Sequence, residues 1–246
     1  MYKNIEEMTL NAWPSLQTMV LDGWLLRFAN GYTKRANSIQ PIYTGTENFN
    51  RKIDLCEEMY AEKGLRTIFK ITPYTFPISL DEQLEKRNYE VIEPSSVLVK
   101  KLTNLEKPAI HSISISEEVT SEWLDTYCKF SNLDNEKAYI HKAIINNIIT
   151  RKVFVILYIE GLPAACGLGV VNGDYVGLYD IVTSEHHRRK GYGKQMILHI
   201  LQWAQRQGIS NGYLQVVKNN MTAIKLYKSL GYSEIYDYWY RVKPIT

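Results

Sequence analysis

Cysteine is scarce in this sequence, no long apolar run occurs, and neither sign of charge dominates. The 246 residues include three cysteines, Cys56, Cys128 and Cys166, which are scattered, odd in number and not spaced as metal ligands. No run approaches the roughly 20 apolar residues that span a bilayer, and the opening MYKNIEEMTLNAW lacks the apolar core of a signal peptide. We therefore expect neither a disulfide framework nor a metal site, and we expect a cytoplasmic protein without a membrane partner.

The charge distribution argues against a general nucleic-acid surface. The net charge is +3, and acidic and basic residues balance within residues 1–105. Much of the excess positive charge is carried by Arg188, Arg189, Lys190 and Lys194. A nucleic-acid-binding protein spreads basic side chains over a whole face. The sequence therefore predicts a local phosphate site and no nucleic-acid partner.

The basic stretch 188–193 lies where a strand passes into a helix. Residues 175–182 are apolar and predict a buried strand, and residues 194–207 have the periodicity of an amphipathic helix. A helix N-terminus exposes unpaired N–H groups and the positive end of the helix dipole, so it attracts phosphate. Gly191 and Gly193 allow a ligand to approach the backbone closely.

Two common phosphate-binding loops are excluded because residues that they require are missing. A Walker loop requires glycine where Arg188 stands and Ser or Thr where Gln195 stands, and a dinucleotide fingerprint requires glycine at Met196. The remaining pattern, Arg-x-x-Gly-x-Gly, resembles the pyrophosphate loop of the GNAT superfamily, the acyl-CoA N-acyltransferases. On this motif alone, a basic turn without a ligand remains an alternative.

A second segment carries the same resemblance. Residues 220–232 (NMTAIKLYKSLGY) are similar to the superfamily pattern N-x-x-A-x-x-L-Y-x-x-x-G-F/Y, and they follow a strand candidate at 212–217. The resemblance therefore covers residues 175–241. One departure is Glu185, where related sequences often carry proline, and it affects the rigidity of the turn before the loop.

The pattern of elements predicts an α/β protein of two units. The C-terminal half reads as strand 112–119, helices 121–132 and 135–149, strands 153–160, 164–171 and 175–182, helix 194–207, strand 212–217, helix 221–230 and strand 235–242. The resemblance implies that this half, residues 109–246, is a catalytic GNAT domain with a mixed sheet and helices on both faces.

The N-terminal half repeats part of that order. It reads as a hairpin of 23–28 and 36–43 around Asn30-Gly31, helix 50–63, strand 66–72, helix 80–87 and strand 91–101. No Arg-x-x-Gly-x-Gly precedes Asn50. We interpret residues 1–105 as a degenerate GNAT-like unit, with an unrelated α/β cap as the alternative.

The resemblance implies that acetyl-CoA binds at the basic loop. The backbone and cations that would hold its pyrophosphate are Arg188, Arg189, Lys190, Gly191, Tyr192, Gly193 and Lys194. The backbone of Ile181, Val182 and Thr183 would pair with pantetheine where the sheet splays, and the Val182 N–H would polarise the thioester carbonyl. Asn220 is expected to cap the last helix and to contact CoA.

Tyr227 and Asp180 are the candidate catalytic residues. Tyr227 matches the motif tyrosine, keeps its proton at neutral pH and would protonate the departing thiolate; a purely structural aromatic is the alternative. Strand alternation places Asp180 on one face with Val176, Leu178 and Val182, where burial would raise its pKa and suit it as a base. A structural hydrogen bond or a water chain as base stays open.

Other reactive side chains are given structural roles. His186 and His187 have no third ligand nearby, and Cys166 is expected in the core rather than as a nucleophile. We expect direct transfer of acetyl from acetyl-CoA to a primary amine of a small molecule, amino acid or peptide, by a monomer or homodimer. The first unit and the aromatic run 236–240 would line the acceptor side. A non-catalytic acyl-CoA sensor and a nucleic-acid module are the rival functions.

Overall fold

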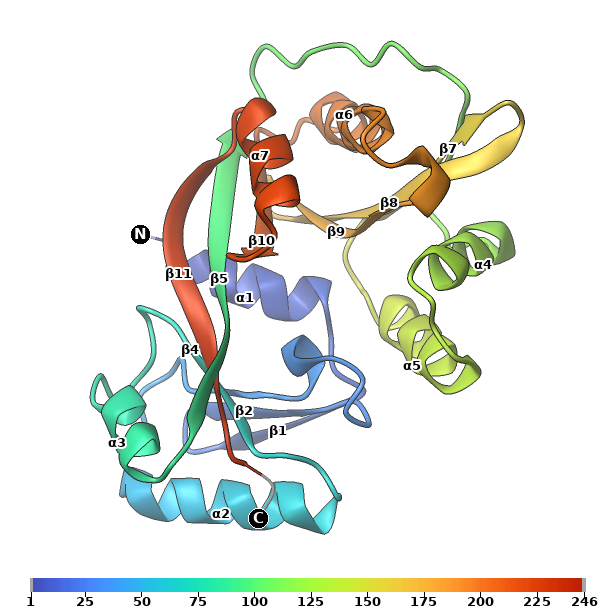
Figure 1. Ribbon diagram of the computed structural model, residues 1–246. Coiled ribbons are helices and arrows are strands. Elements are labelled where there is room, and N and C mark those ends of the chain that lie inside the picture. The colour runs from blue at the N-terminus through green and yellow to red at the C-terminus, as the bar shows by residue number, and fades with distance from the viewer. Residues whose placement is uncertain (1, 245–246) are drawn as a thin grey trace.

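The computed structural model describes residues 2–244, which form one eleven-stranded mixed sheet with helices on both faces (Figure 1). The α-helices of these residues are α1 (Lys3–Ala12), α2 (Phe49–Glu62), α3 (Leu80–Lys86), α4 (Ser121–Phe130), α5 (Asn135–Asn146), α6 (Tyr192–Arg206) and α7 (Met221–Ser229). The strands are β1 (Gln17–Leu21), β2 (Trp24–Phe28), β3 (Ile39–Gln40), β4 (Ile68–Ile71), β5 (Glu90–Lys101), β6 (Ile113–Ser116), β7 (Lys152–Ile159), β8 (Leu162–Asn172), β9 (Tyr175–Thr183), β10 (Asn211–Val217) and β11 (Ser233–Val242). None of the described helices is both long and apolar enough to cross a bilayer.

The two halves of the chain share the sheet. Its order is β1-β2-β3-β4-β11-β5-β10-β9-β8-β7-β6, so β5 of the first half lies between β10 and β11 and runs antiparallel to both. Figure 1 shows β5 and β11 side by side along the middle of the molecule. The strand exchange joins the halves through backbone hydrogen bonds. The division into units 1–105 and 109–246 stays a prediction.

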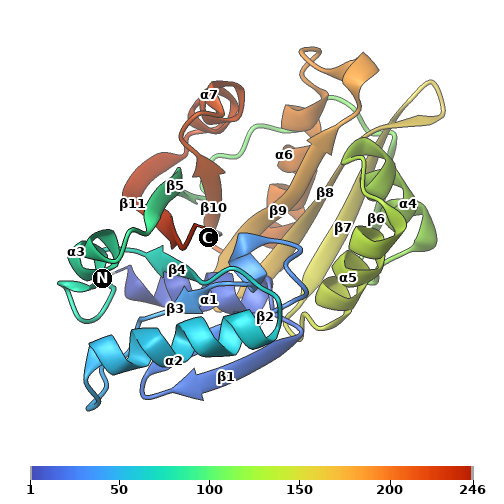
Figure 2. The same cartoon turned by 60° about the horizontal axis from the view of Figure 1, so that its bottom comes forward.

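Helices cover the two faces of β7, β8 and β9 with separate apolar clusters. On one face, α6 packs Met196, Ile200 and Leu201 against the sheet, and on the other, Trp123 of α4 and Ile144 of α5 close a second cluster (Figure 2). Helix α1 joins that second cluster and contacts β8, although it belongs to the first half. The third cluster lies between α2, α3 and β2 to β4.

The expected elements of the C-terminal half are all present, with shifted ends. The largest consequence is at α6, which begins at Tyr192, two residues before the predicted start, so that Gly191 is its N-cap. The expectation that Cys166 lies in the core is also confirmed, because this side chain is fully buried in β8.

The N-terminal half holds two elements that the sequence analysis missed. Helix α1 escapes notice because its inward face carries Glu6 and Thr9, which break the apolar stripe. Strand β1 has mostly exposed side chains and forms a tight hairpin with β2 through Asp22-Gly23. The predicted hairpin around Asn30-Gly31 is wrong as a turn: β2 and β3 pair at only two positions and a longer loop joins them. The Asn37 side chain holds that loop by accepting hydrogen bonds from two of its amides.

Candidate active site

The basic loop presents a row of unpaired backbone donors at the start of α6. Gly191 has a φ of +82°, Arg189 a φ of +63°, and no side chain caps the helix. Within residues 2–244, the amides from Arg189 to Lys194 donate to no other group of the protein. Since these donors meet the positive end of a 15-residue helix, the loop is built to receive an anion.

Two of the four cations at this loop are paired with carboxylates. Arg188 lies 3.4 Å from Glu185, and Lys194 lies 2.7 Å from Glu106. Arg189 and Lys190 make no ion pair with any residue in the described part of the chain. These two side chains are therefore available to a multiply charged ligand.

A groove of about 660 Å³ runs from this loop between β9 and α7. Its walls include the predicted cofactor residues Ile181, Val182 and Thr183, and Asn220 at the start of α7. The Asn220 Oδ1 accepts a hydrogen bond from the Ala223 amide at 3.1 Å, so the predicted helix cap is confirmed. The groove is thus lined by residues of both sequence motifs, the basic loop and the segment that begins at Asn220, which lie more than 25 positions apart in the sequence.

The sheet opens beside this groove. Strands β9 and β10 pair only from Tyr175 to Gly177, after which the β10 side of β9 is free. The Ser184 amide donates to the Ala164 carbonyl of β8 at 2.9 Å, and backbone groups of an antiparallel strand alternate in direction. Val182 therefore directs its N–H toward β8. The amides that face the opening are those of Ile181 and Thr183, which corrects the choice of Val182 as the polarising donor.

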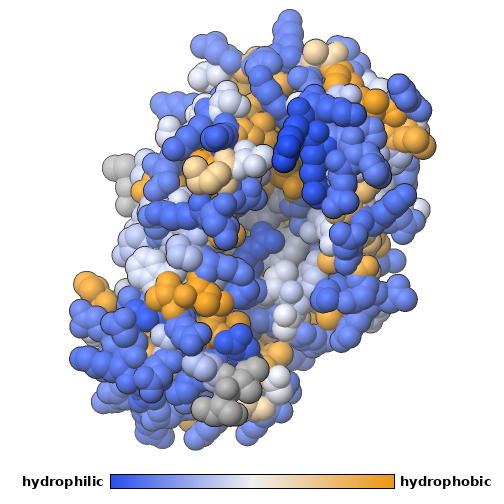
Figure 3. Space-filling model, in the orientation of Figure 1, coloured by the Kyte–Doolittle hydropathy of each residue, from blue (hydrophilic) through white to orange (hydrophobic). Residues whose placement is uncertain are grey.

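A second cavity of about 470 Å³ adjoins the groove, and we call it the acceptor cavity because the acceptor amine is expected on this side. Its lining residues from the first half include Tyr32, Thr33, Lys34, Arg35, Glu93 and Ser95, and those from the second half include Tyr127, Asp180, Gln215, Tyr227, Tyr238 and Tyr240. Figure 3 shows the surface hollowed between the two halves, with mainly hydrophilic and intermediate side chains around the hollow. The groove and the acceptor cavity share Ile181 and Tyr227.

Tyr227 stands in the wall between the two cavities. Its side chain is largely buried in the cluster beneath α6, and burial raises its pKa to about 12. Its hydroxyl forms no hydrogen bond with residues 2–244. The phenol therefore keeps its proton at neutral pH and has a free donor, so the structural and the chemical interpretations of this tyrosine are compatible.

Asp180 occupies a bulge in β9, and this overturns the predicted alternation. Cys166 pairs with Val182 and Leu168 with Tyr179, so Asp180 and Ile181 both lie opposite one residue of β8. The φ of Asp180 is +51°, a left-handed value that aspartate tolerates better than most residues. As a result Val176 and Leu178 pack beneath α6, whereas the Asp180 carboxylate points to the opposite face.

The environment of Asp180 favours its protonated form. The side chain is 1 % exposed, and burial raises its pKa to about 7, although the Arg35 charge acts against the rise. Its Oδ2 lies 3.4 Å from Nε2 of His141, whose pKa burial lowers to about 3. The Tyr32 hydroxyl lies 3.1 Å from the other nitrogen of the same ring. At neutral pH the imidazole is neutral, and the carboxyl group exchanges its proton near pH 7.

Sequence reasoning missed three residues at this site, namely Tyr32, Arg35 and His141. No local motif marks them, and Tyr32 lies 109 positions from His141. Only the packing of the first half against α5 and β9 brings them together.

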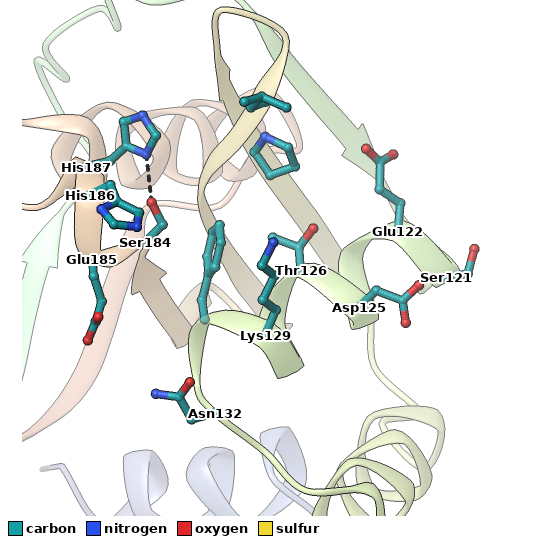
Figure 4. Close-up of a pocket in the computed structure, with 13 residues that line it drawn as sticks. Ser121, Glu122, Asp125, Thr126, Lys129, Asn132, Ser184, Glu185, His186 and His187 are labelled. Atoms are coloured by element: carbon teal, nitrogen blue, oxygen red, sulfur yellow. Dashed lines mark hydrogen bonds between the residues drawn. The ribbon is translucent and has the colours of Figure 1, made fainter.

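A larger cavity of about 740 Å³ lies on the far side of the turn that follows β9 (Figure 4). Its lining includes Glu122, Asp125 and Lys129 of α4 on one side and Ser184 and His187 on the other, and the Ser184 hydroxyl forms a hydrogen bond with the His187 ring at 2.7 Å. Within residues 2–244, no group of three or more His, Cys, Asp or Glu side chains is arranged to hold a metal ion. Tyr227 and Asp180 do not line this cavity, so it is not where their chemistry would occur.

A mixed sheet that splays beside a basic loop at the start of a helix is the fold of GNAT-type N-acetyltransferases. Residues 2–241 match the family described as "Probable histone acetyltransferase Rv0428c C-terminal", and the chain belongs to this family. The match extends over both halves of the chain.

Individual relatives agree with this assignment. The chain is 30% identical to the "Uncharacterized N-acetyltransferase YobR" of Bacillus subtilis, with 98% of each protein covered. A GCN5-related N-acetyltransferase from Kribbella flavida has the same fold, with a TM-score of 0.75, 12% identity and coverage of 100% of this chain and 96% of that one. A tandem GNAT protein from the clavulanic acid biosynthesis pathway superimposes with a TM-score of 0.64 at 10% identity, covering 99% of this chain and 89% of that one. The predicted fold class and family are confirmed.

Proposed function

We propose that this protein transfers the acetyl group of acetyl-CoA directly to a primary amine. The observation that carries the proposal is the position of Tyr227 in the wall shared by the groove and the acceptor cavity. A group placed there reaches a thioester arriving from one side and an amine arriving from the other. The first half of the chain closes the acceptor side and narrows the range of amines.

The groove suits coenzyme A in its charge and its backbone donors. The unpaired amides from Arg189 to Lys194 would hold the diphosphate. Arg189, which lines the groove, and Lys190, next to it in the loop, would supply the matching positive charge. Pantetheine would lie along the open side of β9, where Ile181 and Thr183 direct their backbone groups. This arrangement supports a thioester that ends beside Tyr227.

The transfer needs a base for the ammonium group, a hydrogen-bond donor to the thioester carbonyl and an acid for the departing thiolate. Asp180 accepts a proton from the acceptor ammonium, and its pKa near 7 suits this task at neutral pH. The free amine attacks the thioester carbon, while the Ile181 N–H stabilises the developing oxyanion. The C–N bond forms, the C–S bond breaks, and Tyr227 protonates the departing thiolate. The products are CoA and the N-acetylated amine, and no covalent enzyme intermediate is required.

The role of Cys166 agrees with direct transfer. Burial raises the pKa of its thiol, so the thiolate that a covalent mechanism needs is disfavoured. The side chain is also fully buried in the apolar cluster beneath α4 and α5.

The test is release of free CoA thiol from acetyl-CoA in the presence of a panel of amines, amino acids and peptides. The proposal predicts release that depends on the acceptor and that falls in the Tyr227→Phe protein. Tight binding of acetyl-CoA without release of CoA thiol in the presence of any acceptor would instead identify a non-catalytic sensor that binds acetyl-CoA.

A further inference from the structure

The floor of the acceptor cavity contains a positively charged side chain that makes no close ion pair within the described chain. The Arg35 guanidinium lies over the Trp13 ring at 4.5 Å and 5.9 Å from the Tyr179 ring. Among residues 2–244, no carboxylate lies within 4.0 Å of it, and its side chain donates no hydrogen bond. A guanidinium carries five N–H donors, and leaving them unused in a largely buried place is costly.

The surroundings of Arg35 add positive charge. Arg27 donates hydrogen bonds only to backbone carbonyls, including that of Arg35 itself. Lys70 forms a buried ion pair with Glu6, which uses that acidic side chain. The cluster therefore holds three cations, Glu6 is its one ion-paired anion within the described chain, and Asp180 is a second acidic group whose charge acts on Arg35 but whose raised pKa leaves it partly protonated at neutral pH. This excess of buried charge favours an anionic ligand.

Two neutral donors at the same floor also lack partners. The Nε2 of Gln215 and the hydroxyl of Tyr240 are buried and hydrogen-bond to no group in residues 2–244. Both residues line the acceptor cavity, and with Arg35 and Gln40, whose Oε1 acceptor is also unpaired, they line a second void of about 10 Å³. Buried polar atoms in proteins are nearly always paired, so donors left free at a cavity floor indicate the position of an acceptor group on a ligand.

We propose, on the basis of the function above, that the acceptor is an amine bearing a free carboxylate, an amino acid, whose carboxylate binds Arg35, Gln215 and Tyr240. Its ammonium group then lies toward Asp180, which lines the same cavity. The other cation of this cavity, Lys34, is already paired with Glu93 at 2.6 Å near the rim. A lysine side chain or N-terminus within a protein would bring a neutral amide to Arg35 and would leave its charge unpaired.

The experiment compares each amino acid with its own primary amide in the free-thiol assay. The two have nearly the same shape and differ in the negative charge and in the pKa of the ammonium group, which is lower in the amide. Rates are therefore compared per concentration of free amine, and this correction isolates the carboxylate contact. The proposal predicts a kcat/KM for the acid about 10- to 100-fold above that of the amide, the range expected for hydrogen bonds to charged groups. Equal rates for acid and amide, or acetylation of peptides alone, would overturn the amino-acid assignment and leave acetyl transfer intact. No acetylation of any amine would overturn both.

Variants locate the effect at the cavity floor. Arg35→Gln is expected to remove the preference for acids over amides while the KM for acetyl-CoA stays unchanged, and Arg35→Lys is expected to keep part of it. The matched control is Arg51→Gln, on the exposed face of α2. If Arg35→Gln does not fold, Gln215→Glu supplies the test, because it places a carboxylate at the same floor. It should raise the KM for acids and not for amides, and an unchanged acid-to-amide ratio in this variant would contradict the proposal.

Discussion

Replacing Asp180 by asparagine is expected to make the protein more stable and far less active. Asparagine has nearly the same shape, and it is among the residues that best tolerate the φ of +51° found at this position. The substitution therefore removes the titrating group without straining the bulge. It therefore separates the effect of the buried carboxylate on the free energy of unfolding from its role as a base in the reaction.

The size of the stability change follows from the pKa of the carboxyl group. In the folded protein it is about 7, against 3.8 for an unperturbed aspartate. Between these two pH values the unfolded chain has released the proton and the folded protein still binds it, so the free energy of unfolding falls as pH rises. At about 1.4 kcal/mol for each pH unit, the loss reaches roughly 4 kcal/mol above pH 7. Asparagine does not titrate and avoids this loss.

The assay is denaturant unfolding of both proteins from pH 4 to pH 8. The variant should gain up to about 4 kcal/mol over the wild type above pH 7, and the difference should vanish near pH 4. In the same variant kcat should fall by about 100-fold or more, the usual contribution of a general base. The wild-type rate should rise with pH through about 7, and this dependence should be lost in the variant.

Asp125→Asn, at an exposed position of α4, is the control and should change neither the stability profile nor the rate profile. A variant of Asp180 that is less stable than the wild type at pH 8, or that keeps the wild-type pH dependence of its rate, would refute the assignment of this residue as a buried base.

Two further substitutions test the other parts of the site. Tyr227→Phe should lower kcat about 100-fold through loss of the acid. Stability and the KM for acetyl-CoA should stay nearly unchanged, because the hydroxyl has no partner within the described chain. An unaltered kcat would show that another group is the acid. Gly193→Val should raise the KM for acetyl-CoA at least about tenfold, because a Cβ at Gly193 would lie 3.1 Å from the Thr183 Oγ1 and close the groove. Calorimetry showing wild-type affinity in that variant would contradict the placement of the cofactor.

The cofactor side of the site could be predicted from the sequence because its signals are local. Gly191, the cations beside it and the start of α6 lie within a few positions, and the turn geometry and the helix end are properties of that short segment. The Asn220 cap is local for the same reason. A motif of this kind needs no knowledge of the rest of the fold.

The acceptor side could not be predicted because it depends on long-range packing. Arg35 lies in the loop before β3 and lines one cavity with Asp180 of β9, and His141 arrives from α5. The bulge at Asp180 changed the face of that side chain, and the one local hint was the tolerance of aspartate for a left-handed φ. Helix α1 was missed because Glu6 faces inward, where its partner Lys70 is 64 positions away.

In the proposed mechanism Tyr227 faces both substrates, and the diphosphate of coenzyme A is held at the start of α6. A crystal structure of the protein with bound acetyl-CoA tests it most directly. We expect diphosphate oxygens within hydrogen-bond distance of amides between Arg189 and Lys194, and the thioester sulfur beside the Tyr227 hydroxyl. A thioester that lies in the large cavity beside α4, away from Tyr227, would contradict it.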